Sequence, residues 1–236
     1  MRARILTWNI HKGLHWAART SELEPMREAI RAASADLVLL QEVRGSEAQL
    51  EYLADSLWPH HAYGRNAAYD GGHHGNAIMS RWPIEGVHNL DLTVWRIERR
   101  GALHATIRHP ETRERLHAVS VHLDLFESNR AEQLERLIRY LSAAVPAHEA
   151  LVLGGDFNDW RVRACRPLAA RLGLVDAFRA AEGAPARTFP AHRPTVRLDR
   201  VYGRRWPPET VVSRPVLPAV ALGDHLPLLV DARGSE

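Results

Sequence analysis

Residues that bind metals or transfer protons recur in this sequence at one kind of place, the end of a short apolar run. In chain order, these ends carry Asn9, Glu42, His122 with Asp124, Asp156 with Asn158, Asp199, and Asp224 with His225. Loops at strand ends are where a rigid sheet usually presents catalytic groups. A single polar strand end is most often a solvated turn or a helix cap. A whole set of them, all suited to metal binding or acid–base work, predicts one shared active site.

The types of these residues predict the kind of metal. Carboxylate and amide oxygens suit hard cations such as Mg²⁺, Mn²⁺ or Ca²⁺. Cys165 is the only cysteine, which argues against a thiolate zinc site. The 14 histidines include adjacent pairs at 60–61 and 73–74, but neither pair has the HExxH spacing of a zinc enzyme.

The common motifs of nucleotide-driven and serine-driven chemistry are absent from the sequence. It contains no GxxxxGK[ST], no GxGxxG and no GxSxG. We therefore expect neither phosphoryl transfer from a nucleotide nor hydrolysis by an activated serine.

The elements that must position these residues are short. Apolar runs predict strands at 4–8, 36–42, 76–80, 116–123, 150–153, 197–202 and 228–231. Helical spacing predicts two helices that begin with capping boxes, Ser21 with Glu24 and Asn129 with Glu132, and a weaker helix over 47–58. Strands adjoin one another in the middle and at the end of the chain, which favours mixed sheets. Two sheets packed face to face, with helices outside, would bury both faces of these strands.

Length and composition are those of an ordinary globular protein. The 236 residues are 45% hydrophobic and 25% charged, which predicts one domain over 1–236. Lys12 is the only lysine; the arginines that replace it elsewhere suit phosphate, although a GC-rich genome gives the same composition. With one cysteine, no signal peptide and no apolar run of the roughly 20 residues that a membrane helix needs, we expect a cytoplasmic protein without an integral membrane segment.

Seven motifs, taken together and in order, resemble the endonuclease/exonuclease/phosphatase (deoxyribonuclease-like) superfamily: TWNIHKG, LQEV, HGNAIMSRWPI, VHLD, GGDFND, LDRVYG and GDHLPL. They span almost the whole chain. The resemblance implies an α/β fold, a four-layer sandwich with two mixed β-sheets packed face to face and helices outside. GRNAAYDGGHHGNAIMSR, GDFNDWR and PARTFP are most similar to a short bacterial subgroup associated with cardiolipin synthase gene neighbourhoods.

The resemblance implies a metal site and a water-activating pair. Glu42 would be the principal metal ligand, with Asn9 and Asp224 beside it, and the metal would be Mg²⁺ or Mn²⁺. Asp156 and Asn158 would position and deprotonate the attacking water.

It also implies contacts to the substrate. His225 would contact the phosphate, and Asp199 would fix the tautomer of His225. His122 matches the second histidine of deoxyribonuclease-like members. Asn76 and Arg81 are candidate substrate-binding residues, and Arg81 is equally suited to pairing with a carboxylate.

Two residues depart from the family pattern. His11 stands where some members have an aspartate. His74 stands near the place of the glutamate that supports the second histidine in deoxyribonuclease-like members. The number of metals and the partner of His122 therefore stay open.

Two further expectations concern chain segments near the site. Gly154 and Gly155 are expected to turn the chain tightly and leave room beside the scissile phosphate. Residues 86–114 carry no family-specific motif and are expected to hold substrate-selecting loops.

Together these features predict a metal-dependent phosphodiesterase. Nucleic acid is the first candidate substrate, and a phospholipid headgroup or a small phosphoester, reached from the membrane surface in the lipid case, is the second. The sequence shows no basic arm, aromatic stacking run or amphipathic membrane helix that decides between them. A binding protein on an inactive nuclease fold is disfavoured, because the metal, acid and base candidates are all retained.

Overall fold

Two six-stranded mixed sheets form the centre of the structure, a computed structural model that describes residues 2–15, 20–45, 47–69, 72–94, 99–205, 211–213 and 222–233. The first sheet has the order β11 (Val211–Ser213), β12 (Leu228–Arg233), β1 (Arg2–Asn9), β2 (Leu37–Arg44), β4 (Gly72–Ser80) and β3 (His60–Tyr69). The second has the order β5 (Ile84–Asp91), β6 (Gly101–Arg108), β7 (Arg115–His122), β8 (Ala150–Asp156), β10 (Asp199–Arg204) and β9 (Val175–Asp176). Only β1 with β2 and β7 with β8 are parallel pairs among the described strands.

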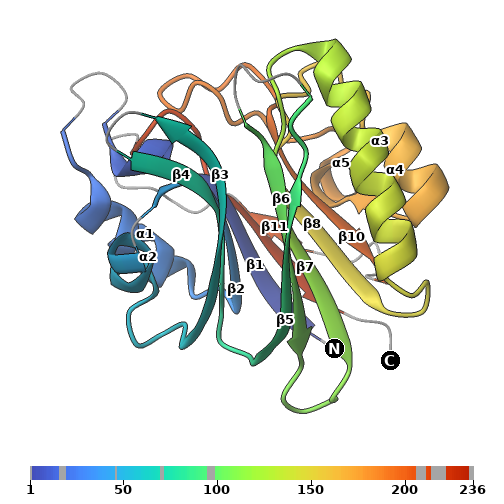
Figure 1. The fold of residues 1–236 in the computed structure, drawn as a ribbon, viewed down its shortest axis with the longest axis horizontal. Coiled ribbons are helices and arrows are strands. Elements are labelled where there is room, and N and C mark those ends of the chain that lie inside the picture. Colours follow the sequence, from blue (N-terminus) through green and yellow to red (C-terminus); the bar gives the residue numbers. More distant parts are fainter. Residues whose placement is uncertain are drawn as a thin grey trace.

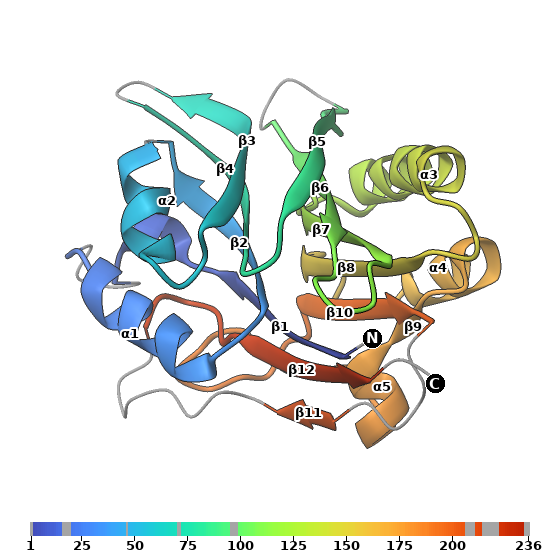
Figure 2. The ribbon, with the colours of Figure 1, turned by 90° about the horizontal axis from the view of Figure 1, so that it is seen from below.

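Helices cover the outer faces of the two sheets (Figures 1 and 2). The first sheet is covered by α1 (Leu23–Ala33) and α2 (Glu47–Ala54), and the second by α3 (Glu127–Ala144) and α4 (Cys165–Leu172). A short 3₁₀ helix, η1 (His11–Gly13), follows β1, and α5 (Ala177–Glu182) lies beside β9 and β10. The predicted four-layer α/β sandwich is confirmed. None of the described helices is long and apolar enough to cross a membrane.

Strand alternation sorts the apolar side chains into three buried layers. Ile5 faces inward and packs in the same layer as Val152 of the opposite sheet. Its neighbour Leu6 faces outward against Met26 of α1, and Leu151 faces outward toward α3. Each such side chain contributes roughly 1.5–3 kcal/mol on burial. Both faces of the central strands are therefore apolar, which is why these strands read as continuous apolar runs in the sequence.

All seven predicted strands are present, with ends shifted by a few residues. The three predicted helices are present too, but neither capping box forms. The first helix begins at Leu23 with Glu22 at its N-cap, and the second begins at Glu127 with Phe126 there; no side chain caps either one. Asn129 instead lies inside the second helix, where its amide donates to Asp124, five residues earlier in the chain.

The two glycines before Asp156 do not form a turn, which corrects the prediction. Both lie inside β8. A Cβ on Gly155, whose φ is 144°, would lie 2.0 Å from the carbonyl oxygen of Val121 on β7. A Cβ on Gly154 would lie 2.8 Å from Leu39 of the opposite sheet. Gly155 therefore allows β8 to lie close to β7, and Gly154 leaves room for Leu39 of the opposite sheet.

The segment 86–114 is also different from the prediction. About half of it forms the strands β5 and β6, which pair with each other over Ile84–Asp91 and Gly101–Arg108. Loop residues remain between these strands, and one of them, Arg100, reaches the site described below.

A buried chain of polar side chains crosses the outer face of the second sheet under α3. Tyr140 Oη lies 2.9 Å from His104 Nδ1, and His104 Nε2 lies 2.9 Å from His117 Nδ1. His117 Nε2 lies 2.5 Å from Glu149 Oε2. Because the carboxylate can only accept, the simplest pattern has each ring donating through Nε2, so that His104 accepts from Tyr140 through Nδ1 and is neutral. Burial, followed by the charges of His117 and His88, lowers the pKa of His104 to about 4.

Acid should destabilise the protein through His104. Its pKa is lower in the folded protein than in the unfolded chain, so its contribution is complete above about pH 6.5 and is lost as the pH falls toward 4. Between pH 7 and 4.5 we expect His104 to account for about 2.5 kcal/mol of lost unfolding free energy. Urea denaturation of the wild type and of His104→Gln at both pH values measures this, with the exposed His61→Gln as the control. A His104→Gln curve with the full wild-type pH dependence would contradict the assignment.

Candidate active site

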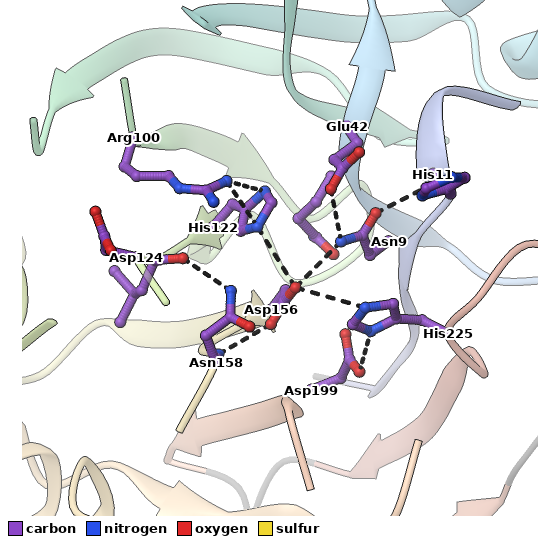
Figure 3. A network of polar contacts seen from close by, with 12 residues as sticks. Asn9, His11, Glu42, Arg100, His122, Asp124, Asp156, Asn158, Asp199 and His225 are labelled. Carbon is purple, nitrogen blue, oxygen red and sulfur yellow. Dashed lines mark hydrogen bonds and ion pairs between the residues drawn. The ribbon is translucent and has the colours of Figure 1, made fainter. Parts of the chain in front are cut away.

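Register in the second sheet places three predicted site residues side by side. Asp156, the last residue of β8, is the partner of His122 on β7 and of Asp199 on β10. Opposed residues of neighbouring strands point to the same face, so these three side chains gather on one face of the sheet, at the end where β8 stops. Figure 3 shows Asp156 at the centre of the resulting network.

Asp156 also connects the two sheets. Asn9, at the end of β1 in the first sheet, donates from Nδ2 to Asp156 Oδ2 at 3.1 Å. The same nitrogen lies 3.4 Å from Glu42 Oε1. The site therefore forms where the ends of the central strands of both sheets meet.

Glu42 reaches this place because β2 has a bulge. Leu40 and Val43 both face the outer layer, although they are three positions apart, and the register with β4 shifts between them. Glu42 itself has a φ of 56°, in the left-handed region that a glutamate rarely adopts. Bulges often redirect a side chain next to an active site, and here the bulge turns the carboxylate toward Asn9.

Asn158 holds the loop that follows β8. It has a φ of 49°, the left-handed conformation that asparagine tolerates. Its backbone N–H donates to Asp156 Oδ1 at 2.9 Å, and its amide donates to the carbonyl of Leu123 at 2.9 Å. The orientation of Asp156 is thus fixed from both ends of its carboxylate. Asp159 plays a different part: it accepts from Ala164 N at the start of α4.

His225 is held in one orientation by Asp199. Its Nδ1 lies 2.8 Å from Asp199 Oδ2, which also accepts from Thr188 Oγ1 at 2.5 Å. Its Nε2 is directed toward Asp156, 3.8 Å from Oδ2. Burial opposes the charged ring, but Asp199 and Asp156 outweigh it and raise the pKa of His225 to about 10. The ring is therefore an imidazolium at neutral pH.

His122 has the opposite character. Its Nε2 lies 3.5 Å from Asp156 Oδ2 and 2.8 Å from Arg100 Nη1. Burial, and then the charge of Arg100, lower the pKa of His122 well below the usual value. A guanidinium only donates, so the ring accepts from it and stays neutral. Two histidines on either side of one carboxylate are thus in different protonation states, a pattern typical of acid–base sites.

Arg100 was missed in the sequence, and it is the partner of His122 that was left open there. It lies outside every motif, in a segment that resembles no active-site stretch. Only the pairing of β6 with β7, which aligns Gly101 with His122, brings it to the site. Thr188 was missed for a different reason: it lies inside the motif PARTFP, but its contact with Asp199, 11 positions along the chain, has no signal in the sequence.

Asp156 is almost completely buried. Asp156 is 2% exposed, and burial raises its pKa to about 6 even though His225 opposes the shift. A carboxylate with a pKa near neutrality is suited to accept a proton at physiological pH.

Asp224 lies beside His11, the residue that stands where some members of the superfamily have an aspartate. The two side chains are 3.3 Å apart, between Asp224 Oδ2 and His11 Nδ1. Burial alone would raise the pKa of Asp224, but the His11 hydrogen bond and the charges of His225 and His11 lower it. Lys12 lies 3.7 Å from Glu42 in the same way. Both predicted metal-ligand carboxylates therefore have a basic neighbour from η1, and the Asp224 carboxylate raises the pKa of His11.

Two donor sets could hold a cation. Ligand atoms of Asp156, Asp199 and His225 lie within 4.8 Å of one another. In that set, however, the Nδ1 proton of His225 is bonded to Asp199, and an imidazolium is a poor ligand.

The predicted set of Glu42, Asn9 and Asp224 fits a hard divalent cation better. It offers only oxygen ligands, which hard cations prefer, whereas the other set includes the His225 ring. Among the described residues each set has one buried oxygen without a hydrogen-bond partner, Oδ1 of Asp224 in the first and Oδ1 of Asp199 in the second. We therefore keep these three residues as the candidate metal site.

The two predicted substrate-binding residues lie elsewhere. Asn76 is fully buried between the sheets, and its amide donates to the carbonyls of Gly101 and Ser120 at 2.8 and 3.1 Å. This places Asn76 as a bridge between the sheets; a contact with substrate stays a prediction. Arg81 follows β4 next to the beginning of β2, at the opposite end from Glu42, and its guanidinium lies 3.8 Å from Asp36. The structure does not bring Arg81 to the site, and its carboxylate-pairing role is the one observed.

The ends of the central strands, where the two packed sheets meet, carry buried carboxylates, one neutral and one cationic histidine, and the candidate metal site. These features define a hydrolase-type site for an anionic substrate. Comparison with known proteins agrees. The profile of the Endonuclease/Exonuclease/phosphatase family matches residues 6–225, so the chain belongs to this family. Members of the family are hydrolases that act on phosphoester bonds.

Three known proteins are similar to the chain in sequence or in fold. The chain is 42% identical to the uncharacterized protein YbhP of Escherichia coli (strain K12) over 238 residues, covering 95% of this chain and 94% of YbhP. It also shares its fold with an endonuclease/exonuclease/phosphatase from Beutenbergia cavernae, with a TM-score of 0.81, 23% identity, and coverage of 99% of this chain and 72% of that one. The human Nocturnin catalytic domain has a TM-score of 0.80 and 20% identity, covering 99% of this chain and 94% of that one.

Replacing Asp199 with asparagine should lower the pKa of His225, because the carboxylate is the main group that stabilises the imidazolium. Long-range ¹H–¹⁵N NMR of metal-free protein follows the protonation of the ring. We expect a protonated wild-type ring through pH 8 and a ring that titrates at lower pH in Asp199→Asn. The control is Asp231→Asn, which removes the partner of Arg4 at the opposite end of β1. An unchanged His225 titration in Asp199→Asn would show that Asp199 does not set its charge.

Proposed function

We propose that the protein is a divalent-metal-dependent phosphodiesterase. The observation that carries this proposal is Asp156, a buried carboxylate with the neutral His122 on one side and the cationic His225 on the other. Such a site combines a base with fixed positive charge, which is what attack by water on an anionic phosphoester needs.

The residues divide the work of the reaction in this proposal. Asp156 accepts a proton from the attacking water, and Asn158 keeps the carboxylate in place. His225, as an imidazolium, donates through Nε2 toward the phosphoryl oxygens and the leaving oxygen. Arg100 adds positive charge beside His122. General acid–base help of this kind contributes about 10²- to 10⁴-fold.

Mg²⁺ or Mn²⁺ would be held by Glu42, Asn9 and Asp224. When bound, it would neutralise negative charge on the phosphoester. Lys12 already places positive charge beside Glu42, and His11 bonds to Asp224, so we propose a single metal and not two.

Nucleic acid and phospholipid headgroups both remain candidate substrates. The arginine-rich composition supports nucleic acid, and the structure of the Nocturnin domain, which has this fold, carries a bound sulfate anion. A lipid headgroup is supported by a group of exposed apolar side chains beside the site, Leu125, Phe126 and Trp160.

Chelation should remove the activity. Hydrolysis of bis-p-nitrophenyl phosphate is expected with Mg²⁺ or Mn²⁺, and EDTA should abolish it until excess metal is added. Plasmid DNA and phosphatidylglycerol vesicles, assayed in the same buffer, report which class of substrate is cleaved. Full activity in EDTA would exclude the metal from the mechanism.

Asp156→Asn should lose the reaction while the protein stays folded. The amide keeps the size of the side chain but cannot accept a proton, so we expect turnover of bis-p-nitrophenyl phosphate to fall by at least about 10²-fold. The control is Glu85→Gln on edge strand β5, where the carboxylate pairs with Arg108 on the surface. Near wild-type turnover by a folded Asp156→Asn protein would remove Asp156 from the mechanism.

A further inference from the structure

Three large apolar side chains are exposed on the loops that border the site. Leu125 and Phe126 follow β7 and are 56% and 61% exposed, and Trp160 follows β8 and is 44% exposed. The carboxyl ends of the parallel strands β7 and β8 lie at one edge of the sheet, the edge that carries His122 and Asp156. We call Leu125, Phe126 and Trp160 the apolar rim.

The first of these loops is fixed by buried polar side chains. Asp124 accepts from the backbone N–H of Phe126 at 2.8 Å and from Asn129 Nδ2 at 3.2 Å. Gln133, which is fully buried, accepts from the backbone N–H of Asp124 at 2.8 Å. Arg130 donates to the carbonyls of Asp124 and Leu125.

The same arginine supports the second loop. The Arg130 guanidinium lies 4.6 Å from the centre of the Trp160 ring. One buried side chain of α3 therefore holds both parts of the apolar rim. These contacts therefore hold three large apolar side chains at the surface, on the loops next to the site.

A pocket borders the apolar rim between α3 and α4. It has a volume of about 420 Å³. Leu134 and Ile138 of α3 line it together with Leu123 and Phe157, the chain neighbours of His122 and Asp156. Its lining also includes Arg130, which lies under Trp160. The pocket lies next to the rim loops and is large enough for part of an acyl chain; its lining combines these apolar side chains with the charged Glu127, Glu135, Asp159 and Arg163.

Charges around the rim favour an anionic surface. The exposed guanidiniums of Arg161 and Arg163 both pair with one carboxylate, that of Glu127, so this group carries a net positive charge. An apolar wedge of Leu, Phe and Trp flanked by arginines is suited to the boundary between lipid headgroups and acyl chains. Base stacking would use the aromatic rings but leaves the aliphatic Leu125 and the apolar pocket without a role.

We propose that the apolar rim docks the protein onto a phospholipid bilayer with anionic headgroups, next to the site that would cleave a phosphodiester. The proposal rests on the proposed phosphodiesterase function and assigns its substrate class: the phosphodiester of a lipid within a bilayer.

Vesicle binding tests docking without turnover. Wild-type protein in EDTA is sedimented with vesicles of phosphatidylglycerol and phosphatidylcholine, and separately with phosphatidylcholine alone. We expect binding to the anionic vesicles, and a partition coefficient about tenfold lower for Leu125→Ser/Phe126→Ser. The matched control is Val87→Ser/Val175→Ser, which removes side chains that are 52% and 55% exposed on the edge strands β5 and β9 and should bind as the wild type does. Thermal unfolding of each variant confirms that it is folded, and Trp160→Ala provides a second variant on the other loop.

The outcomes separate the two possible partners. Wild type that does not bind vesicles, or rim variants that bind as well as wild type, would overturn the proposal. So would rim variants that bind vesicles normally but lose affinity for a single-stranded oligonucleotide, because the rim would then be a stacking platform. Bis-p-nitrophenyl phosphate has no bilayer, so its hydrolysis by wild type reports on the phosphodiesterase function alone. Vesicle binding without that hydrolysis would refute the function and leave the docking surface in place.

Discussion

The carboxylate of Asp156 is the constraint on which the site depends. A carboxylate that is 2% exposed is costly to bury unless it is bonded and paired, and three neighbouring groups meet part of that need. The backbone of Asn158 and the amide of Asn9 donate to it, and His225 faces it as a cation. Because Asn9 belongs to the opposite sheet, satisfying this one carboxylate also fixes how the two sheets meet. Folding and the proposed chemistry therefore use the same contacts.

The two histidines show how environment sets chemical role. His122 and His225 lie on either side of Asp156, yet one has Arg100 as a neighbour and the other has Asp199. Burial, and then the guanidinium, keep the first ring neutral, and the carboxylate keeps the second charged. The two rings can differ because each is held by a different strand or loop. The loops that carry the apolar rim follow β7 and β8 on the same side of the sheet, next to these residues.

The sequence predicted the layers and most of the site because both depend on local pattern. Apolar runs identified seven strands, and polar residues at their ends identified Asn9, Glu42, Asp156 and His225. What it missed depends on long-range packing. The bulge that redirects Glu42, the cross-strand alignment that delivers Arg100, and the close approach that requires Gly155 leave no local signal. Arg81 shows the opposite case. A motif suggested a contact with substrate, but Arg81 follows β4 at the end far from the site and pairs with Asp36.

The central claim is that Glu42, Asn9 and Asp224 hold the metal while Asp156 and His225 act on the phosphoester. A crystal grown with Mn²⁺ and inorganic phosphate, measured at the manganese absorption edge, tests it most directly. The account predicts one anomalous peak within bonding distance of Glu42 and Asp224, with the phosphate between that ion and His225. A peak bonded to Asp156, Asp199 and His225 would contradict it, because the imidazolium would then have to be a metal ligand.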